Sequence, residues 1–258
     1  MCMISAGSDA GSRAIKVVLI DAEVVTVVGA AVSDQGVDQE ALSRVVFERA
    51  LADAGMTRGQ VGKVVATGYG RNRVSFADTT ITEITCHARG VRQVVPNART
   101  VIEVGGQDSK LIRLDAKGNV RDFAMNDRCA AGTGRFLEVV ASRLGVGLET
   151  LGTLAAQSRN PASISSTCVV FAETEIVGML ASGLPVEDII AGVQSAVARR
   201  VVAMAGRNVD APIVFTGGVA LIPGMLEAMA RAIGKPVQVA PDPQMTGALG
   251  AAILASGL

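Results

Sequence analysis

Apolar residues recur in short stretches along the chain, either at helical spacing or in the compact runs typical of buried strands. Leu42, Val46 and Phe47 recur at helical spacing before Gly55, which predicts a helix that ends there. In the first part of the chain these patterns predict strands over 14–20, 23–32 and 63–67 and helices over 38–54 and 81–91. We expect the first two strands to pair antiparallel.

The order of elements begins again after Pro96-Asn97, which is typical of a domain boundary. Asp115 and Gly118 mark a good turn between two strands that we expect to form a hairpin. The second part predicts strands over 100–104, 110–114, 120–125, 212–216 and 237–240, and helices over 186–207, 222–233 and from about 244. We therefore expect an α/β protein with domains 1–95 and 96–258. The sequence leaves open whether the last helix packs on the first domain.

Two segments of the first part have counterparts in the second. The glycine-containing segment 7–12 comes before the first predicted hairpin, and 103–110 comes before the second. Likewise, 65–68 resembles 214–218, since both end in Thr-Gly. A duplicated, strand-rich unit with a phosphate-type turn in each copy predicts two facing lobes with a nucleotide between them.

Glycine turns let backbone N–H groups approach phosphate oxygens, because no Cβ stands in the way. We expect Asp9 and Glu103 to hold Mg²⁺, and Gln107 or Asp108 to orient an attacking water. A single such turn usually only closes a hairpin, so the prediction depends on the pair of turns. We assign nucleotide binding to Gly11, Ser12, Lys16, Gly105, Gly106, Gly217, Gly218 and Gln244.

Other nucleotide motifs are missing from the sequence. There is no Gly-x-x-x-x-Gly-Lys-Ser/Thr segment and no full dinucleotide fingerprint. His87 is the one histidine, so a histidine-based metal cluster is excluded, and we expect His87 to pack or hydrogen-bond.

Two cysteines, Cys129 and Cys168, each stand directly before a predicted helix. The free N–H groups and positive dipole at a helix N-terminus lower a thiol pKa and favour metal–sulfur chemistry. A four-thiolate iron–sulfur cluster needs two more cysteines, which a symmetric dimer would supply. Free cysteine is also often a small buried hydrophobe, so the residues alone leave both interpretations open. Cys2 is near the chain start, and Cys86 is expected to pack.

The composition argues against a nucleic-acid-binding, membrane-spanning or secreted protein. Of 258 residues, 49% are hydrophobic, enough for a core in each of two lobes. The 24 basic and 24 acidic residues balance, and no basic face or aromatic platform points to nucleic acid. No apolar run reaches roughly 20 residues, and no signal peptide is evident. We expect no membrane contact and a reducing, cytoplasmic location.

Several segments together resemble the ATP-dependent activator family of 2-hydroxyacyl-CoA dehydratases, which also contains ATPase subunits of benzoyl-CoA reductase. The Cys129 segment is the most specific part, and the resemblance runs from about residue 6 to the end. It is carried by residues 66–72, 104–110, 125–138, 165–173, 216–220 and 247–252.

This resemblance implies an actin-like, sugar-kinase-like ATPase fold with two ribonuclease-H-like lobes that binds ATP or ADP with Mg²⁺. It also implies a homodimer with one [4Fe–4S] cluster, held by Cys129 and Cys168 of each copy. Such proteins take electrons from ferredoxin or flavodoxin and pass them singly, driven by ATP hydrolysis, to an iron–sulfur acyl-CoA dehydratase or reductase.

Three alternatives stay open. A near neighbour of the leading hypothesis is an ATPase subunit of a permanent benzoyl-CoA reductase complex. A small-molecule kinase on the same fold would leave both helix-start cysteines without a role. A nucleotide-gated binding protein would bind without turnover.

Overall fold

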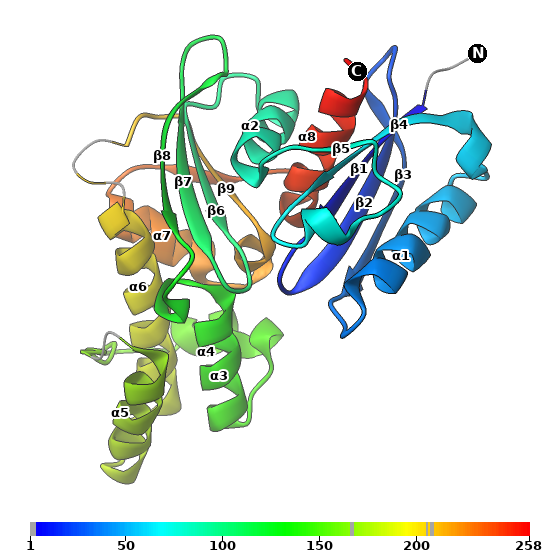
Figure 1. Ribbon diagram of the computed structural model, residues 1–258. Helices are drawn as coiled ribbons and strands as arrows, with labels where there is room; N and C mark the ends of the chain where they lie inside the picture. The colour runs from blue at the N-terminus through cyan, green and yellow to red at the C-terminus, as the bar shows by residue number, and fades with distance from the viewer. Residues whose placement is uncertain (1–3, 166–167, 205, 207–208) are drawn as a thin grey trace. The chain divides into compact units, whose positions relative to one another are not determined.

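Two five-stranded mixed sheets, each covered by helices, make up the computed structural model, which describes residues 4–165, 168–204, 206 and 209–258 (Figure 1). They belong to two compact units. Unit 1 comprises the described residues up to Ala98, together with Leu114–Arg121 and Ala240–Leu258. Unit 2 comprises Arg99–Arg113 and the described residues of Asp122–Val239.

The sheet of unit 1 has the strand order β3-β2-β1-β4-β5. Its central strand β1 is buried at every position, pairs antiparallel with β2 and runs parallel to β4. The strands are β1 (Ile4–Ala10), β2 (Ala14–Asp21), β3 (Thr26–Asp34), β4 (Val61–Thr67) and β5 (Thr79–Thr80).

Helix α1 (Gln39–Asp53) covers one face of this sheet, where Phe47 and Leu51 join a core with residues of β1 and β2. Asp38 caps the helix by accepting a hydrogen bond from the Ala41 N–H. On the other face, α8 (Thr246–Ala255) packs against β1, β2 and β4, and α2 (Glu83–Val94) packs against α8.

Glycines allow α2 and α8 to approach closely. A Cβ on Gly90 would overlap the carbonyl oxygen of Thr246, and one on Gly250 would overlap the carbonyl oxygen of Cys86. The C-terminal helix is therefore packed into the core of unit 1.

The sheet of unit 2 has the order β10-β9-β6-β7-β8, in which β6 pairs antiparallel with β7 and parallel with β9. Both sheets thus place their first strand between a meander and a parallel strand. The strands are β6 (Thr100–Val104), β7 (Ser109–Leu114), β8 (Val120–Asn126), β9 (Ile213–Thr216) and β10 (Val237–Val239).

Helices of unit 2 share one apolar core with its sheet, in which Phe136 and Phe215 are buried. The helices are α3 (Gly134–Leu144), α4 (Leu151–Ala156), α5 (Val169–Ala181), α6 (Val186–Met204) and α7 (Met225–Ile233). Single 3-10 turns span Arg58–Gln60, Arg71–Arg73, Ala130–Gly132, Leu148–Thr150, Gly218–Leu221 and Pro243–Met245.

The structure confirms the α/β class and the predicted elements, with ends shifted by a few residues. It corrects the segment 7–12, which the sequence analysis assigned to a turn. Residues up to Ala10 belong to strand β1, and the turn begins at Gly11. In the described part of the chain no single helix has the length and hydropathy of a membrane span. Among the described residues, only the helical segments Gly134–Leu144 and Leu148–Ala156 together have the length and hydropathy of a span, and a 94° bend separates them.

Candidate nucleotide and cluster sites

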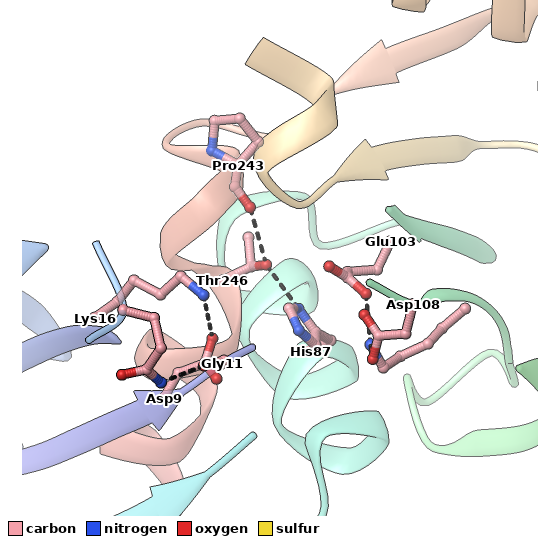
Figure 2. A network of polar contacts seen from close by, with 10 residues as sticks. Asp9, Gly11, Lys16, His87, Glu103, Asp108, Pro243 and Thr246 are labelled. Carbon is pink, nitrogen blue, oxygen red and sulfur yellow. Dashed lines mark hydrogen bonds and ion pairs between the residues drawn. The ribbon is translucent and has the colours of Figure 1, made fainter. Parts of the chain in front are cut away.

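Asp9 and Lys16 form an ion pair at the end of β1 in unit 1, in which Asp9 is buried and Lys16 is half-buried. They are directly opposed across β1 and β2, and Lys16 Nζ donates to Asp9 Oδ2 at 3.1 Å (Figure 2). The other carboxylate oxygen, Oδ1, faces Gly68, where a Cβ would overlap it. The pair therefore holds Asp9 in one orientation beside a glycine turn.

The β1–β2 turn carries Gly11 and Ser12. Gly11 N–H donates to the Ala14 carbonyl at 3.1 Å, and Gln35 Nε2 donates to the Gly11 carbonyl at 2.7 Å. A Cβ on Gly11 would lie 2.9 Å from Lys16 Nζ. Gly11, Lys16 and Asp9 thus lie together, as the sequence analysis predicted, with half-buried Ser12 next to them.

His87 ties α2 to the start of α8 on the same side of the sheet. Its Nδ1 lies 2.9 Å from Thr246 Oγ1, and Thr246 Oγ1 donates to the Pro243 carbonyl at 3.4 Å (Figure 2). The prediction that His87 hydrogen-bonds is confirmed. A Cβ on Gly247 would lie 3.1 Å from both His87 Nε2 and Asp9 Oδ2, so α8 begins next to the Asp9 carboxylate.

Gln244 lies in the 3-10 turn that leads into α8. It lines a cavity of about 410 Å³ in unit 1, whose walls include Val18 of β2, Val32 of β3 and Leu249 of α8. Gln244 is therefore close in sequence to the Thr246–Gly247 start of α8 and borders a largely apolar cavity.

Unit 2 repeats the carboxylate–lysine arrangement with one more carboxylate. Glu103 and Lys110 are directly opposed across β6 and β7. Lys110 Nζ donates to Glu103 Oε2 and to Asp108 Oδ2, both at 2.7 Å. Lys110 and Glu103 are almost wholly buried, and the Asp108 side chain is 20% exposed.

The remaining oxygens of these carboxylates face glycines. A Cβ on Gly105 would lie 2.6 Å from Asp108 Oδ1 and 3.3 Å from Glu103 Oε1. A Cβ on Gly217 would lie 2.7 Å from Glu103 Oε1, and its φ of +89° also requires glycine. The structure thus brings Glu103 and Asp108 together with Gly105 and Gly217.

Other predicted residues of unit 2 lie around this cluster. Gln107 is exposed in the β6–β7 turn, and Gly218 begins a 3-10 turn where a Cβ would meet no atom within 4 Å. The carbonyls of Gly105 and Gly106 accept hydrogen bonds from Gly134 N–H at 2.9 Å and Arg135 N–H at 2.8 Å. The predicted phosphate turn is therefore bound directly to the first residues of α3.

Sequence reasoning did not assign Gly68, Thr246, Gly247 or Lys110 to the site. Lys110 could have been predicted from the sequence, because it follows Glu103 by the same seven positions that separate Lys16 from Asp9. Thr246 and Gly247 could not, since their position depends on α8 returning to the sheet of unit 1.

Both candidate cluster cysteines, Cys129 and Cys168, lie in unit 2, and neither forms a disulfide with a described residue. Cys168 is exposed and is the N-cap residue of α5, as predicted, with its carbonyl accepting from the Ala172 N–H at 2.9 Å. The neighbouring Ser166 and Thr167 lie outside the described residues.

The prediction for Cys129 needs a correction. Cys129 precedes the single 3-10 turn Ala130–Gly132 rather than α3, which begins at Gly134. Its backbone is held by Asn126, which accepts from Cys129 N–H at 3.0 Å and donates from Nδ2 to the Cys129 carbonyl at 2.7 Å. Cys129 is half-buried against the core of unit 2.

The other two cysteines differ from these. Cys86 is buried against Val65 and Ala251, which confirms its packing role, and this burial raises the pKa of its thiol to about 12. Cys2 lies outside the described residues. In the part of the chain that the structure describes, no group of three or more His, Cys, Asp or Glu side chains could hold a metal ion.

Comparisons with known proteins agree with this geometry. The chain is 45% identical over 255 residues to the 2-hydroxyisocaproyl-CoA dehydratase activator of Clostridioides difficile, covering 98% of this chain and 95% of the relative. A solved structure of the Clostridium difficile activator of this dehydratase with bound ADPNP superposes with a TM-score of 0.93 at 44% identity, covering 99% of this chain and 95% of that one.

A glucokinase of the ROK family from Streptomyces griseus shares the fold alone. It has a TM-score of 0.61 at 16% identity and covers 99% of this chain and 100% of its own. The expected actin-like, sugar-kinase-like ATPase fold is confirmed. The sequence pattern of the BadF/BadG/BcrA/BcrD ATPase family matches residues 6–255, almost the whole chain, and the protein therefore belongs to that ATPase family.

Proposed function

We propose that this ATPase activates a 2-hydroxyacyl-CoA dehydratase by donating single electrons to it, driven by ATP hydrolysis. The observation that carries the proposal is the pair of carboxylate–lysine contacts beside glycine turns, Asp9–Lys16, which is partly buried, and Glu103–Lys110, which is buried. Near-full-length identity of 45% to a named dehydratase activator supports the choice of partner.

Each unit contains residues that we assign to binding a nucleotide with Mg²⁺. In unit 1, the proposed phosphate ligands are the turn at Gly11 and Ser12 and the side chain of Lys16. In unit 2, they are the turn at Gly105 and Gly106. Side chains larger than glycine at Gly105 would collide with the carboxylates, which supports a cradle for a ligand at that turn. We place the adenosine near Gly217 and Gly218, and we keep Gln244 as a proposed nucleotide-binding residue of unit 1.

Asp9 and Glu103 are the proposed carboxylates for Mg²⁺, which when bound would neutralise charge on the phosphates. Their lysine partners fix each carboxylate in one orientation before the nucleotide arrives. Gln107 or Asp108 would orient the attacking water, since both lie in the β6–β7 turn. Such positioning carries most of the rate acceleration in phosphoryl transfer.

Cys129 and Cys168 are the proposed cluster ligands. One chain supplies two free thiols for this role, so two copies of a homodimer would supply the four that a [4Fe–4S] cluster takes. Val170 and Phe171 follow Cys168 on α5 and are each 68% exposed, which supports a protein partner at this end of the helix. Held by these cysteines, a cluster would supply single-electron transfer between ferredoxin or flavodoxin and the iron–sulfur acyl-CoA enzyme, in the cytoplasm.

Anaerobic purification followed by iron and sulfide analysis tests the proposal. We expect about four iron atoms per homodimer and a brown protein. Cys129→Ser and Cys168→Ser should each lose the iron, whereas Cys86→Ala, a change in the core of unit 1, should keep it. Full iron in Cys129→Ser would contradict the ligand assignment.

Purification also separates the alternatives. A free homodimer that restores activity to a separate dehydratase supports the activator, whereas an inseparable hetero-oligomer indicates a subunit of a benzoyl-CoA reductase complex. A colourless protein that phosphorylates a small acceptor would indicate a kinase instead. Nucleotide binding with neither turnover nor redox activity would indicate a nucleotide-gated binding protein.

A further inference from the structure

Lys110 is the most deeply buried charged side chain of unit 2, and its ammonium serves two carboxylates at once. Only 2% of the side chain is exposed, and Nζ lies 2.7 Å from both Glu103 Oε2 and Asp108 Oδ2. Each carboxylate therefore gives one oxygen to Lys110. The other oxygens, Glu103 Oε1 and Asp108 Oδ1, lie 3.3 Å and 2.6 Å from one point, the position of a Cβ on Gly105.

Unit 1 provides an internal comparison for this cluster. Lys16 occupies the same position relative to Asp9 that Lys110 occupies relative to Glu103, directly opposite on the next strand. Lys16 balances the charge of one carboxylate, whereas Lys110 shares its single charge between two. The named side chains thus carry no net charge in unit 1 and one negative charge in unit 2.

Because Glu103 Oε1 and Asp108 Oδ1 both lie within 3.3 Å of one point on a negatively charged cluster, they would attract a divalent cation. A cation bound to them would lie within a carboxylate's width of the Lys110 ammonium, and the two positive charges repel each other strongly where water is excluded. Lys110 cannot relieve this repulsion by swinging into solvent, because it is buried among both carboxylates and the sheet.

We propose that Lys110 is a specificity-determining residue that keeps Glu103 and Asp108 from holding a divalent cation without nucleotide. The metal then enters with the phosphates, whose negative charge offsets the repulsion from the ammonium. Mg²⁺ commonly binds in this way, through one or two carboxylates together with substrate phosphates. The inference rests on the proposed Mg²⁺–nucleotide site and adds the order in which its parts assemble.

Mn²⁺ binding to the nucleotide-free, full-length protein tests this role, with free Mn²⁺ measured by electron paramagnetic resonance at room temperature. We expect Lys110→Met to bind one Mn²⁺ per chain at least about tenfold more tightly than the unmodified protein. Lys110→Arg keeps the charge and should stay close to the unmodified protein. Lys16→Met is the matched control in unit 1 and should gain little, because it exposes a single carboxylate.

A second neutral variant keeps the test usable if replacing the buried Lys110 by Met prevents folding. Lys110→Gln is neutral but still donates to carboxylates, so it should show the same tighter Mn²⁺ binding if Lys110→Met does not fold. Adding Glu103→Gln to either variant should abolish the gain. Unchanged Mn²⁺ affinity in a folded neutral variant overturns the inference, as does equal tightening in Lys110→Arg.

The measurement uses no ATP, so its outcome is independent of the proposed activity. Weak ATP hydrolysis with a tenfold Mn²⁺ gain would count against the proposed function and leave the role of Lys110 supported.

Discussion

His87 Nδ1 lies 2.9 Å from Thr246 Oγ1, and this contact joins α2 to the first residue of α8 across 159 positions of sequence. Thr246 is followed by Gly247, which lies beside the Asp9 carboxylate. The C-terminal helix therefore borders the functional end of β1, and the His87–Thr246 contact holds it there.

Breaking this contact should destabilise unit 1. Thr246→Val leaves a buried His87 nitrogen without its hydroxyl partner, which costs about 1–3 kcal/mol of unfolding free energy. Denaturant unfolding measures the loss. His87→Ala combined with Thr246→Val should cost less than the sum of the single changes, because both remove one interaction. Arg89→Ala, exposed on the same helix, should change stability little, and additive losses would contradict the coupling.

A substitution that disturbs the packing of α2 on α8 should lower the stability of unit 1 more than loss of the His87–Thr246 hydrogen bond does. Gly90→Ala places a methyl group into the Thr246 carbonyl, so we expect a loss of more than about 3 kcal/mol or no folded protein. Gly178→Ala, within α5, meets no atom within 4 Å and should instead stabilise by up to about 1 kcal/mol through helix propensity. Thermal unfolding of both variants checks this, and equal effects would contradict it.

The sequence predicted most elements correctly because their hydrophobic patterns are regular, but it missed β1. Strand β1 has the sequence Ile-Ser-Ala-Gly-Ser-Asp-Ala, which after Ile4 contains only small residues and one aspartate and none of the large β-branched residues of typical strands. The reason is structural: Gly7 packs so closely against α8 that a Cβ would overlap the Ala248 carbonyl. Because α8 lies at the other end of the chain, its packing on Gly7 leaves no local signal in the sequence.

The residues of the candidate site likewise divide into those that a local sequence pattern reveals and those that only tertiary packing brings to the site. Asp9, Gly11 and Lys16 could be grouped from sequence because they lie within one short segment of the chain, and Glu103 and Asp108 lie within another. Thr246 and Gly247 could not, since tertiary packing of α8 places them beside Asp9. The single 3-10 turn after Cys129 was also missed, because Ala130-Ala131-Gly132 has no pattern that separates it from α3.

The thiol of Cys86 should make stability depend on alkaline pH. Its pKa rises from 9.0 to about 12 on folding, chiefly through burial, so the unfolded chain loses this proton first as pH rises. The stabilisation is therefore complete below about pH 9 and declines towards pH 12, with about 2 kcal/mol lost by pH 10.5. Cys86→Ala should show a flatter decline of unfolding free energy across this range. Parallel pH profiles for the two proteins would contradict the assignment.

Asp9 should matter more for turnover than for binding. Asp9→Asn keeps the shape of the side chain but removes the charge that would position Mg²⁺ at the reacting phosphates. We expect a fall in kcat of about 100-fold, with nucleotide affinity changed by less than about tenfold. Steady-state hydrolysis and calorimetric nucleotide binding separate the two effects. Asp34→Asn, an exposed aspartate on β3, is the control, and an equal loss of binding and turnover would contradict the role.

Nucleotide and cluster should be coupled through the start of α3. The Gly105 carbonyl accepts from Gly134 N–H, and Gly134 stands five residues after Cys129, so a shift of the phosphate turn acts directly on the segment that carries this cysteine. If ATP and ADP favour different redox states, linkage requires the cluster potential to differ between them, by about 59 mV for each tenfold preference.

Electrochemical titration with ADP and with a non-hydrolysable ATP analogue measures this difference. Gly134→Ala should reduce it, because the added methyl group would lie 3.1 Å from both the Gly105 carbonyl and Val219 Cγ2 and would push the turn away from α3. Gly178→Ala serves again as the control, since no atom lies near its added methyl group. Equal potentials in both nucleotide states of the unmodified protein would refute the coupling. A difference that survives intact in Gly134→Ala would refute the route through the Gly105–Gly134 contact and leave the coupling itself supported.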